Sequence, residues 1–253
     1  GGSFEPEGWD PGQSVLAPLL RSQGRKHIDL AVVSHPHPDH LNGFLYLSKN
    51  FHIREFWWNG MASDLPILQK IIQNIEHKGG ITKTLPHIRE QKRANVHLEM
   101  LHPKSVHAHG YFPAMHLNDN SIVLRLTYKK ASILFSGDIE KDAEAHLLSN
   151  IKPTDILKVA HHGSRSSSTP DFVKALSPQL AFISVGKNNR FGLPNTDVLE
   201  RFEKHDVTIR RTDHHGMITL QTNGYKWEID SLNAETVSLT PAGKPLGQKQ
   251  PHL

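Results

Sequence analysis

The sequence of 253 residues contains no cysteine. Disulfide bonds are therefore excluded, and so are the thiolate ligands of a structural zinc site. A metal ion in this chain would have to be held by histidine and carboxylate side chains, a ligand set that suits zinc, manganese, iron or cobalt. The absence of cysteine is compatible with either side of a membrane, so it does not fix the compartment.

Also missing is any apolar run close to the ~18 residues that a membrane-spanning helix needs. The chain opens Gly1-Gly2-Ser3, without an initiator methionine or a signal peptide. We therefore expect an excised domain, whose upstream sequence could hold membrane segments or a targeting signal. The fragment itself leaves the localisation unknown.

The composition is that of a soluble globular protein, with 37% hydrophobic and 21% charged residues. Short β-like runs alternate with helix-like ones, which predicts an α/β fold. We expect one domain over residues 1–230 and a disordered tail over residues 231–253, where polar residues, Pro and Gly replace apolar ones. The net charge of +4 mildly favours a polyanionic partner.

The most informative segment is Ser34-His35-Pro36-His37-Pro38-Asp39-His40, directly after an apolar run. Each of the first two histidines precedes a proline, which favours extended backbone, and alternate residues of an extended segment point the same way. His35, His37 and Asp39 can thus share one face, whereas His40 joins them only if the chain turns at Asp39. The pattern predicts ligands for two adjacent metal ions. The alternative is a polar loop in a chain that contains 19 histidines.

Two further strand ends carry similar chemistry. Asp138 follows Ser136-Gly137 at the end of a predicted strand, and it could bridge two metal ions or cap the next helix. His161 and His162 follow another apolar strand, and in an extended segment they would point to opposite sides. One of them is then a metal ligand, while the other hydrogen-bonds a ligand residue or acts on substrate as an acid.

Weaker candidates lie in predicted loops. His116 is a candidate third ligand for the first metal ion, close to Asn118–Ser121, whose residue types turn chemistry explains well. Ser164 and Arg165 suit phosphate oxygens, although a serine run is often only a flexible loop. The segment 186–195 could hold a nucleic-acid backbone or be merely solvated.

Together these motifs resemble the metallo-β-lactamase superfamily, and most closely the C-terminal hydrolase domains of the ComEC family of competence DNA-uptake proteins. The resemblance rests on H-x-H-x-D-H, then a Gly-Asp strand end, then a further strand-end histidine. The matching segments are 9–12 with 16–24, 34–40, 118–126, 136–140, 157–164, 189–192 and 211–213 with Gly216. In one departure, Leu193 stands before proline where the family often has histidine.

The resemblance implies an αββα sandwich with the site at one edge of two packed sheets, and it places the first strands of the fold upstream of Gly1. It also implies two divalent metal ions, zinc or manganese. The first ion would take His35, His37 and His116. The second would take Asp39, His40 and His162, with Asp138 bridging the two.

The same resemblance implies a mechanism in which a hydroxide shared by the two ions attacks phosphorus in line. The implied catalytic residues are Asp39, Asp138 and His161. The implied substrate-binding residues are Lys158, Ser164, Arg165 and Asn120.

The implied function is hydrolysis of phosphodiester bonds by a nuclease that degrades DNA, with single-stranded DNA as the expected substrate, during DNA uptake. The chain would then be a soluble domain on the extracytoplasmic side of a cell-membrane protein, fused to or docked on a membrane channel outside this fragment. Two alternatives stay open. One is a phosphocholine esterase or another small-ester hydrolase of the same fold, and the other is a non-catalytic domain that guides DNA.

Overall fold

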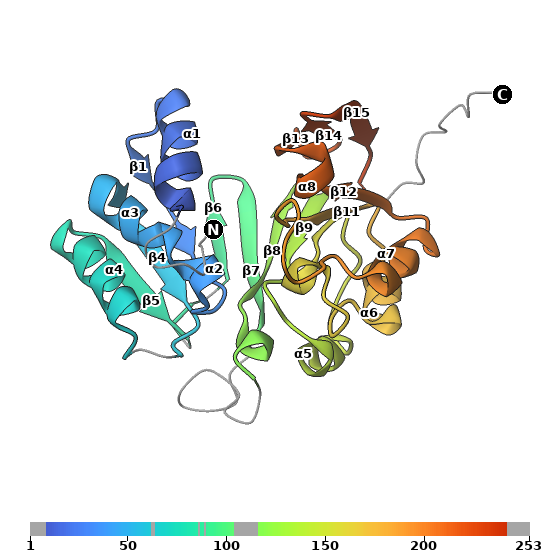
Figure 1. The fold of residues 1–253 in the computed structure, drawn as a ribbon, viewed down its shortest axis with the longest axis horizontal. Helices are drawn as coiled ribbons and strands as arrows, with labels where there is room; N and C mark the ends of the chain where they lie inside the picture. The colour runs from blue at the N-terminus through green and yellow to red at the C-terminus, as the bar shows by residue number, and fades with distance from the viewer. Residues whose placement is uncertain (1–8, 62–63, 86, 89, 104–115, 242–253) are drawn as a thin grey trace. The chain divides into compact units, whose positions relative to one another are not determined.

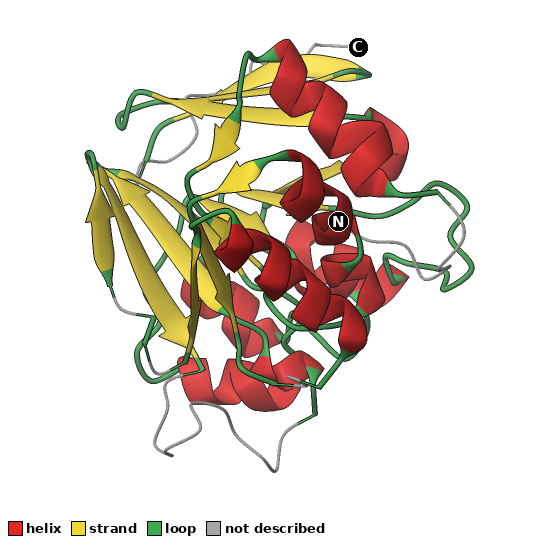
Figure 2. Cartoon of the chain, turned by 90° about the vertical axis from the view of Figure 1, so that its left-hand side faces the viewer, coloured by secondary structure: helices red, strands yellow, loops and turns green. Residues whose placement is uncertain are grey.

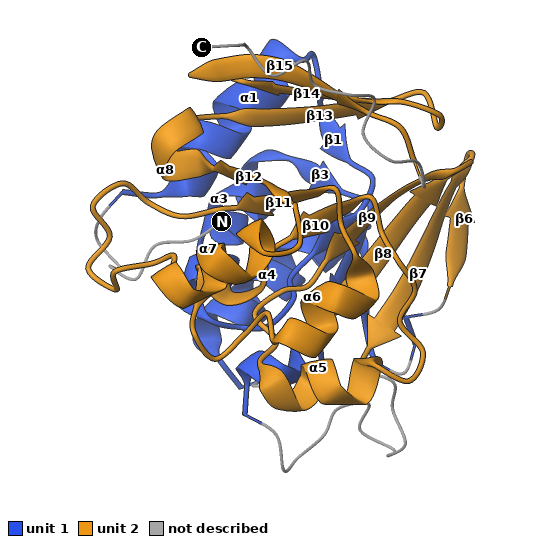
Figure 3. Ribbon diagram, turned by 90° about the vertical axis from the view of Figure 1, so that its right-hand side faces the viewer, with its two compact units in different colours: residues 1–89, 103–122 blue, residues 90–102, 123–253 orange. Residues whose placement is uncertain are grey.

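The computed structural model describes residues 9–61, 64–85, 87–88, 90–103 and 116–241. Two compact units divide the chain, unit 1 with residues 1–89 and 103–122 and unit 2 with residues 90–102 and 123–253 (Figure 3). Each unit has its own hydrophobic core, so the predicted domain 1–230 holds more than one core. Both units contain helices and strands, which Figure 2 colours red and yellow.

Unit 1 is built from short parallel strands and helices. Its elements are η1 (Gly12–Leu16), α1 (Ala17–Ser22), β1 (His27–Ile28), β2 (Ala31–Val32), α2 (Pro38–Leu41), α3 (Gly43–Asn50), β3 (His52–Ile53), β4 (Glu55–Trp58), α4 (Pro66–His77), β5 (Ile81–Thr84) and η2 (Asn118–Asn120). The strands form a parallel sheet in the order β2-β4-β5 and a parallel pair β1-β3. Figure 1 labels β1, β4 and β5 among them. Helix α3 lies between β2 and β4 in the chain, and α4 between β4 and β5, because parallel neighbours need crossover connections.

The amphipathic helix α4 closes the core of unit 1. Its buried residues Leu68, Ile71 and Ile75 recur at the spacing of one helix face. Lys78, just after the helix, donates from Nζ to the carbonyl oxygens of Ser48 at 2.8 Å and Lys49 at 2.5 Å. These carbonyls belong to the last turn of α3, which has no intrahelical donors for them, so Lys78 ties the two helices together.

Unit 2 contains a mixed seven-stranded sheet in the order β12-β11-β10-β9-β8-β7-β6. Its pairs from β6 to β9 are antiparallel, and those from β9 to β12 are parallel. The elements of unit 2 are β6 (Gln91–Arg93), β7 (Val96–His102), β8 (Val123–Tyr128), β9 (Ala131–Phe135), α5 (Lys141–Leu147), β10 (Ile156–Lys158), η3 (Ala160–Gly163), α6 (Pro170–Leu176), β11 (Leu180–Ile183), α7 (Thr196–Glu203), β12 (Thr208–Arg211), α8 (Thr212–His215), β13 (Ile218–Thr222), β14 (Trp227–Ser231) and β15 (Ala234–Leu239). Among the described residues, no helix combines the length and apolar character that crossing a bilayer requires.

Both faces of this seven-stranded sheet are covered within unit 2. On one face, Leu134 and Leu157 pack against helices α5, α6 and α7. On the other face, Ile133 and Ile156 pack against the small antiparallel sheet β13-β14-β15. Trp227 of this sheet lies in the same hydrophobic core. Neighbouring residues of a strand point to opposite faces, so a continuous apolar run is what a strand buried on both sides requires.

The prediction of a disordered tail from residue 231 is wrong up to residue 241. Ser231 ends β14, and Ala234–Leu239 forms β15, which pairs with β14 in an antiparallel register. Val237 and Leu239 pack in the core between the two sheets. Their spacing of two was a strand signal that the polar composition of the segment obscured. Residues 242–253 lie outside the described residues.

Other boundaries differ locally from the sequence pattern. Strands β8 and β9 form an antiparallel hairpin around Lys129 and Lys130. The apolar run before Ser34 contains two short strands, β1 and β2, and the polar segment 91–93 forms strand β6. Short strands depend on their partners for pairing, so their limits are poorly marked in sequence.

One buried carboxylate joins three segments of unit 2. Oδ2 of Asp155 accepts from the backbone N–H of Ser132 at 2.7 Å and from the indole Nε1 of Trp227 at 3.3 Å. The backbone N–H of Asp155 donates in turn to Ser132 Oγ at 3.1 Å. Burial lowers the pKa of nearby Arg125, and the charges of Glu99 and Asp155 act against this lowering. Asp155 therefore holds β9, the start of β10 and β14 in register.

Replacing Asp155 with alanine should destabilise the chain by about 3 kcal/mol or more, because two buried N–H donors would lose their acceptor. Urea unfolding followed by circular dichroism measures this loss. The matched control is Glu235→Ala, which removes an exposed carboxylate from β15. Equal stability of the two variants would contradict the role given to Asp155.

An ion pair forms at the junction between β12 and α8. Arg211 donates from Nε to Asp213 Oδ1 at 3.0 Å and from Nη2 to Oδ2 at 2.6 Å. Burial raises the pKa of Asp213, but the hydrogen bonds and charge of Arg211 outweigh burial and hold the pKa of this carboxyl below its usual range. The carboxylate of Asp213 thus binds a proton less readily in the folded state than in the unfolded state.

Because the folded-state pKa of Asp213 is depressed, its contribution to stability is present above the unfolded carboxyl pKa and is lost as pH falls through the folded value. Asp213→Asn should therefore lower the free energy of unfolding most near neutral pH, and the difference from wild type should shrink below about pH 4. Urea unfolding of both proteins over a pH series measures this. A difference from wild type that stays constant over the pH series would contradict the assignment.

Candidate metal centre

The first group of candidate ligands follows β2 in unit 1. His37 is extended, with φ −72° and ψ 149°, and Pro38 then begins the short helix α2. Proline suits the first position of a helix because its missing N–H has no intrahelical acceptor there. The chain therefore turns one residue before Asp39, and His40 comes round toward the preceding histidines.

The three imidazoles are packed together. His35 Nε2 lies 2.9 Å from His37 Nδ1, and the rings of His35 and His40 have centroids 4.4 Å apart. His40 Nε2 lies 3.5 Å from Asp39 Oδ2. Two nitrogens at tetrahedral zinc positions, each about 2.0–2.1 Å from the ion, would be separated by about 3.3 Å. The geometry of His35 and His37 is close to that of a pair sharing one ion.

Two serines hold the other side of the His35 ring, which is fully buried. Ser34 Oγ and Ser121 Oγ each lie 3.1 Å from His35 Nδ1. With the proton on Nδ1, a serine oxygen accepts it, and Nε2 keeps its lone pair for a metal ion. Ser34 Oγ also lies 3.3 Å from Nδ1 of His40, so it serves two rings.

Ser121 reaches His35 because its segment is fastened to the rest of unit 1. The backbone N–H of Ile122 donates to Ser34 O at 2.9 Å, and Asn59 Nδ2 donates to Asn120 O at 3.0 Å. The sequence pattern indicated only a turn here and did not point to Ser121. No local signal could have found it, because its partner His35 is 86 residues away.

Two predicted residues of this segment have other surroundings. The side chain of Asn120 is buried and donates from Nδ2 to His116 O at 3.2 Å, so it holds the turn. His116 itself is exposed. A substrate contact of Asn120 and a metal contact of His116 stay predictions.

The second group of candidate ligands belongs to unit 2. Asp138 is buried and follows Gly137, whose φ of +55° gives the tight turn after β9. Ser136 Oγ donates to Lys158 O, and the backbone N–H of His161 donates to Gly137 O at 3.2 Å. The ends of β9 and β10 are thus bonded to each other, which brings Asp138 and the histidine pair together.

The extended conformation expected for the histidine pair is wrong. His161 has φ +48° and His162 φ +53°, which are left-handed values, followed by Gly163 at +82°. The left-handed conformation costs non-glycine residues roughly 1–2 kcal/mol each. Such strain persists only where surrounding contacts impose it, and it is concentrated at functional sites.

The left-handed turn gives the two histidines different partners. His162 Nδ1 lies 2.6 Å from Ser184 O, and a carbonyl can only accept, so the proton is on Nδ1. In the neutral ring with its proton on Nδ1, Nε2 carries the lone pair, and this nitrogen lies 3.8 Å from Asp138 Oδ2. His161 Nδ1 instead lies 3.2 Å from Oε1 of Glu140, a residue that the sequence pattern did not point to.

The predicted phosphate-binding residues have structural partners of their own. Lys158 Nζ donates to Val159 O at 2.7 Å, and Arg165, which is exposed, pairs through Nε with Asp197 Oδ2 at 3.1 Å. Ser164 Oγ lies 3.0 Å from Ser166 Oγ. Their roles toward substrate stay predictions.

The serine run after His162 is well bonded in unit 2. Ser167 Oγ donates to Ile139 O at 2.8 Å, and the backbone N–H of Ser168 donates to the buried carboxylate of Glu144 at 2.5 Å. Arg201 Nη1 donates to Ser168 O at 3.0 Å. The alternative of a flexible loop therefore does not fit this segment.

The donor sets of both units fit a divalent metal ion. They offer imidazole nitrogens and carboxylate oxygens, the ligands left to a chain without cysteine. In His35 and His162 the nitrogen turned away from the candidate ligands is bonded to the protein, as is usual for metal-binding histidines.

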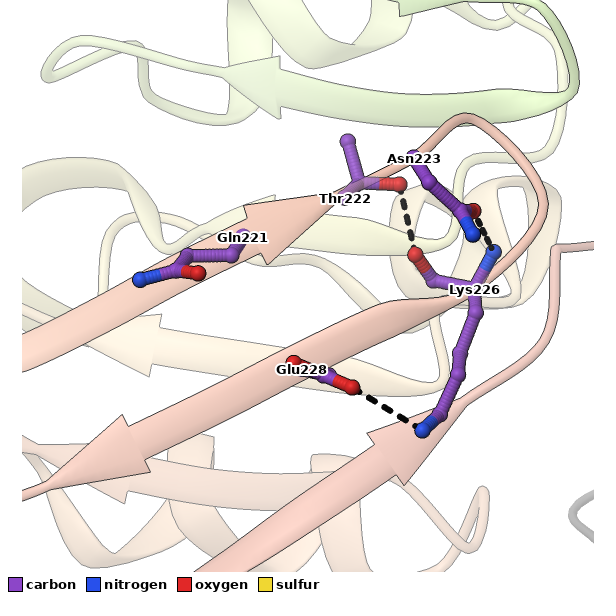
Figure 4. A pocket seen from close by; sticks show the side chains of 5 residues that line it. All are labelled: Gln221, Thr222, Asn223, Lys226 and Glu228. Atoms are coloured by element: carbon purple, nitrogen blue, oxygen red, sulfur yellow. Dashed lines mark hydrogen bonds and ion pairs between the residues drawn. The ribbon is translucent and has the colours of Figure 1, made fainter.

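A pocket elsewhere in unit 2 does not share this chemistry. It has a volume of about 270 Å³ and lies at the β13–β14 hairpin, lined by Gln221, Thr222, Asn223, Lys226 and Glu228 (Figure 4). Its polar groups bond one another, as when Lys226 Nζ contacts Glu228 Oε1 at 3.0 Å. No predicted ligand lines it, so we place the candidate centre at the histidine clusters.

The comparisons with known proteins agree with these motifs. The model of the family described as "Beta-lactamase superfamily domain" matches residues 9–167. The chain is 33% identical over 215 residues to ComE operon protein 3 of Bacillus subtilis, an alignment covering 82% of this chain and 26% of that protein. It is 28% identical over 220 residues to Competence protein ComA of Neisseria gonorrhoeae, covering 81% and 27%. The chain thus spans about a quarter of the length of these relatives.

A solved structure shares the fold. A mutant of CmlA beta-hydroxylase superposes with a TM-score of 0.51 at 14% identity, over 74% of this chain and 43% of that one. The predicted α/β fold class is confirmed. The family match over residues 9–167 and the 33% identity to the B. subtilis protein show that this chain belongs to the beta-lactamase superfamily domain family.

Proposed function

We propose that the chain is a metal-dependent phosphodiesterase, and specifically a nuclease that degrades DNA during DNA uptake. The observation that carries the proposal is the arrangement of the candidate ligand rings within each unit. His35 Nε2 lies 2.9 Å from His37 Nδ1 in unit 1, and His162 in unit 2 has its Nδ1 proton bound by Ser184 O. Both arrangements prepare imidazole nitrogens for a cation.

The ligands divide between two ions as in the motif order of the family. His35, His37 and His116 would hold the first ion. Asp39, His40 and His162 would hold the second, and Asp138 would bridge them. That the ligands of unit 1 and unit 2 serve the same pair of ions rests on the family membership.

The choice of DNA as the substrate class is supported by one relative and by the net charge of the chain. Competence protein ComA is a relative over 81% of this chain, and competence is the uptake of DNA. The chain carries a net charge of +4, which suits a polyanion. A role in uptake implies work on the extracytoplasmic side of a membrane, which we propose as the location.

The residues of unit 2 around Asp138 supply the proton chemistry. A divalent metal ion, when bound by these ligands, would supply Lewis-acid activation of water and of the phosphodiester. Glu140 Oε1 lies 3.2 Å from His161 Nδ1, which is an ion-pair distance, and His161 is the group placed to give a proton to the leaving oxygen from Nε2. Both side chains are about a quarter exposed, which gives substrate access to them.

The proposal is tested with the purified chain, manganese or zinc, and a labelled single-stranded DNA. Wild type should cleave it. His37→Ala and Asp138→Ala should each lower kcat/KM by more than the ~100-fold that loss of an outer-shell partner typically costs. Gel electrophoresis of the products measures cleavage.

The exposed variant His77→Ala, at the end of α4, is the matched control and should cleave like wild type. Cleavage that survives both ligand substitutions would sink the metal-dependent nuclease. Hydrolysis of small esters without cleavage of DNA would assign the chain to the other hydrolases of this fold. DNA binding without turnover would favour the guiding domain.

The positioning role of Ser121 can be tested separately. Ser121→Ala removes one of the two hydroxyls on His35 Nδ1, so metal affinity should fall by about 10- to 100-fold. Competition with a zinc-binding dye measures this affinity without reference to turnover. Ser149→Ala, an exposed serine, is the control, and equal affinities in the two variants would contradict the role of Ser121.

A further inference from the structure

The loop between β11 and α7, residues 186–195, is attached at both ends to the turn that carries His162. Ser184 O, just before the loop, accepts from His162 Nδ1 at 2.6 Å, and the N–H of Asn195 donates to Gly163 O at 2.9 Å. A Cβ on Gly163 would lie 2.5 Å from Pro194 Cβ, so the two backbones pack as closely as glycine permits. The loop is therefore held in place beside the candidate ligand His162. It lies beyond the residues 9–167 that the family model matches.

One side chain fixes the internal shape of this loop. Asn189 donates from Nδ2 to Leu193 O at 2.7 Å and to Gly186 O at 3.2 Å. Its Oδ1 accepts from the N–H of Leu193 at 3.0 Å. The three residues between Asn189 and Leu193 thus form the tip of a loop that the hydrogen bonds of Asn189 close. A tip held in this way loses less conformational entropy when it binds a ligand.

The tip presents an aromatic ring and a cation to solvent. Phe191 is 56% exposed, and the guanidinium carbon of Arg190 lies 5.0 Å from the centre of its ring. Arg190 and Lys187 are exposed as well. An exposed phenylalanine forgoes the free energy of burial, roughly 1.5–3 kcal/mol, which a binding partner could supply. An aromatic face next to cations suits a nucleobase and its phosphates.

Phe191 lies near enough to His162 for both to act on one strand. It is three residues from Pro194, which limits the chain between them to about 11 Å. That distance corresponds to about three stacked nucleotides at ~3.4 Å each. A base within a few nucleotides of a phosphodiester at His162 can therefore reach the ring.

We propose that Phe191 and Arg190 form a stacking platform for an unpaired base of single-stranded nucleic acid. The inference deepens the proposed function and rests on it for the choice of substrate. Single strands are favoured because the faces of their bases are accessible, whereas in a duplex each base face is already covered by its neighbours. Arg190 contacts the phosphates or covers the second face of the base.

The test compares two 12-mers, one of deoxythymidine and one of the same length with abasic sites, both fluorescently labelled. Their binding to the complete 253-residue chain is measured by anisotropy with the cation chelated by EDTA, so cleavage does not intervene. Wild type should prefer the strand with bases. Phe191→Ala should weaken binding of that strand by about 5- to 150-fold, the fold-change of 1–3 kcal/mol per stacked base, and leave the abasic strand nearly unchanged.

Two further variants separate stacking from charge. Phe191→Tyr keeps an aromatic face and should retain the preference for bases, whereas Arg190→Ala should weaken both strands. Tyr225→Ala is the matched control, because Tyr225 is 55% exposed in the β13–β14 hairpin. It should leave the binding of both strands unchanged.

Equal affinity of wild type for the two strands, or an equal loss on both in Phe191→Ala, would overturn the platform and assign the ring to a protein contact. The nuclease proposal fails in a different way, through absence of DNA cleavage with manganese or zinc. Base-dependent binding without cleavage would keep the platform and remove the nuclease. Cleavage without base-dependent binding would keep the nuclease and remove the platform.

Discussion

The chemistry of the candidate centre depends on which nitrogen of each imidazole carries a proton. In His162 the carbonyl of Ser184 can only accept, so Nδ1 carries a proton and Nε2 is the nitrogen left for a metal ion. In His35 two serine hydroxyls occupy the Nδ1 side, and Nε2 is directed at His37. A histidine without such partners would distribute its proton between both nitrogens. The fold thus places a proton on Nδ1 of His162, and at His35 it turns Nδ1 toward hydroxyls and leaves Nε2 facing a candidate ligand.

The backbone near His162 also determines where the two histidine rings point. His161 and His162 adopt left-handed values at a cost of roughly 1–2 kcal/mol each, and bonds to Gly137 and Asn195 offset that cost. The turn sends one ring toward Asp138 and the other toward Glu140. It also anchors the loop 186–195, so a candidate ligand, a candidate proton donor and an exposed aromatic tip share one rigid support.

Much of the centre could be predicted because its signals are local. Two prolines favour extended backbone at His35 and His37, and the second also begins the helix that turns His40 toward them. The conformation of the second histidine pair was mistaken because left-handed residues other than glycine have no reliable sequence signal. The tail was mistaken because β15 acquires its order from pairing with β14, which a polar composition does not reveal.

The sequence by itself determined the chemistry of this protein: a ligand set of histidine and aspartate, the absence of thiolates, and the order of motifs that identifies the family. Only the tertiary structure decided the state of those ligands. Ser121 meets His35 across 86 residues, and Ser184 meets His162 across 22. Contacts at such separations form only when the sheets and their connections fold, so no local pattern specifies them. The residue types could therefore be predicted from the chain, whereas the hydrogen-bond partner of each ring was decided by the fold.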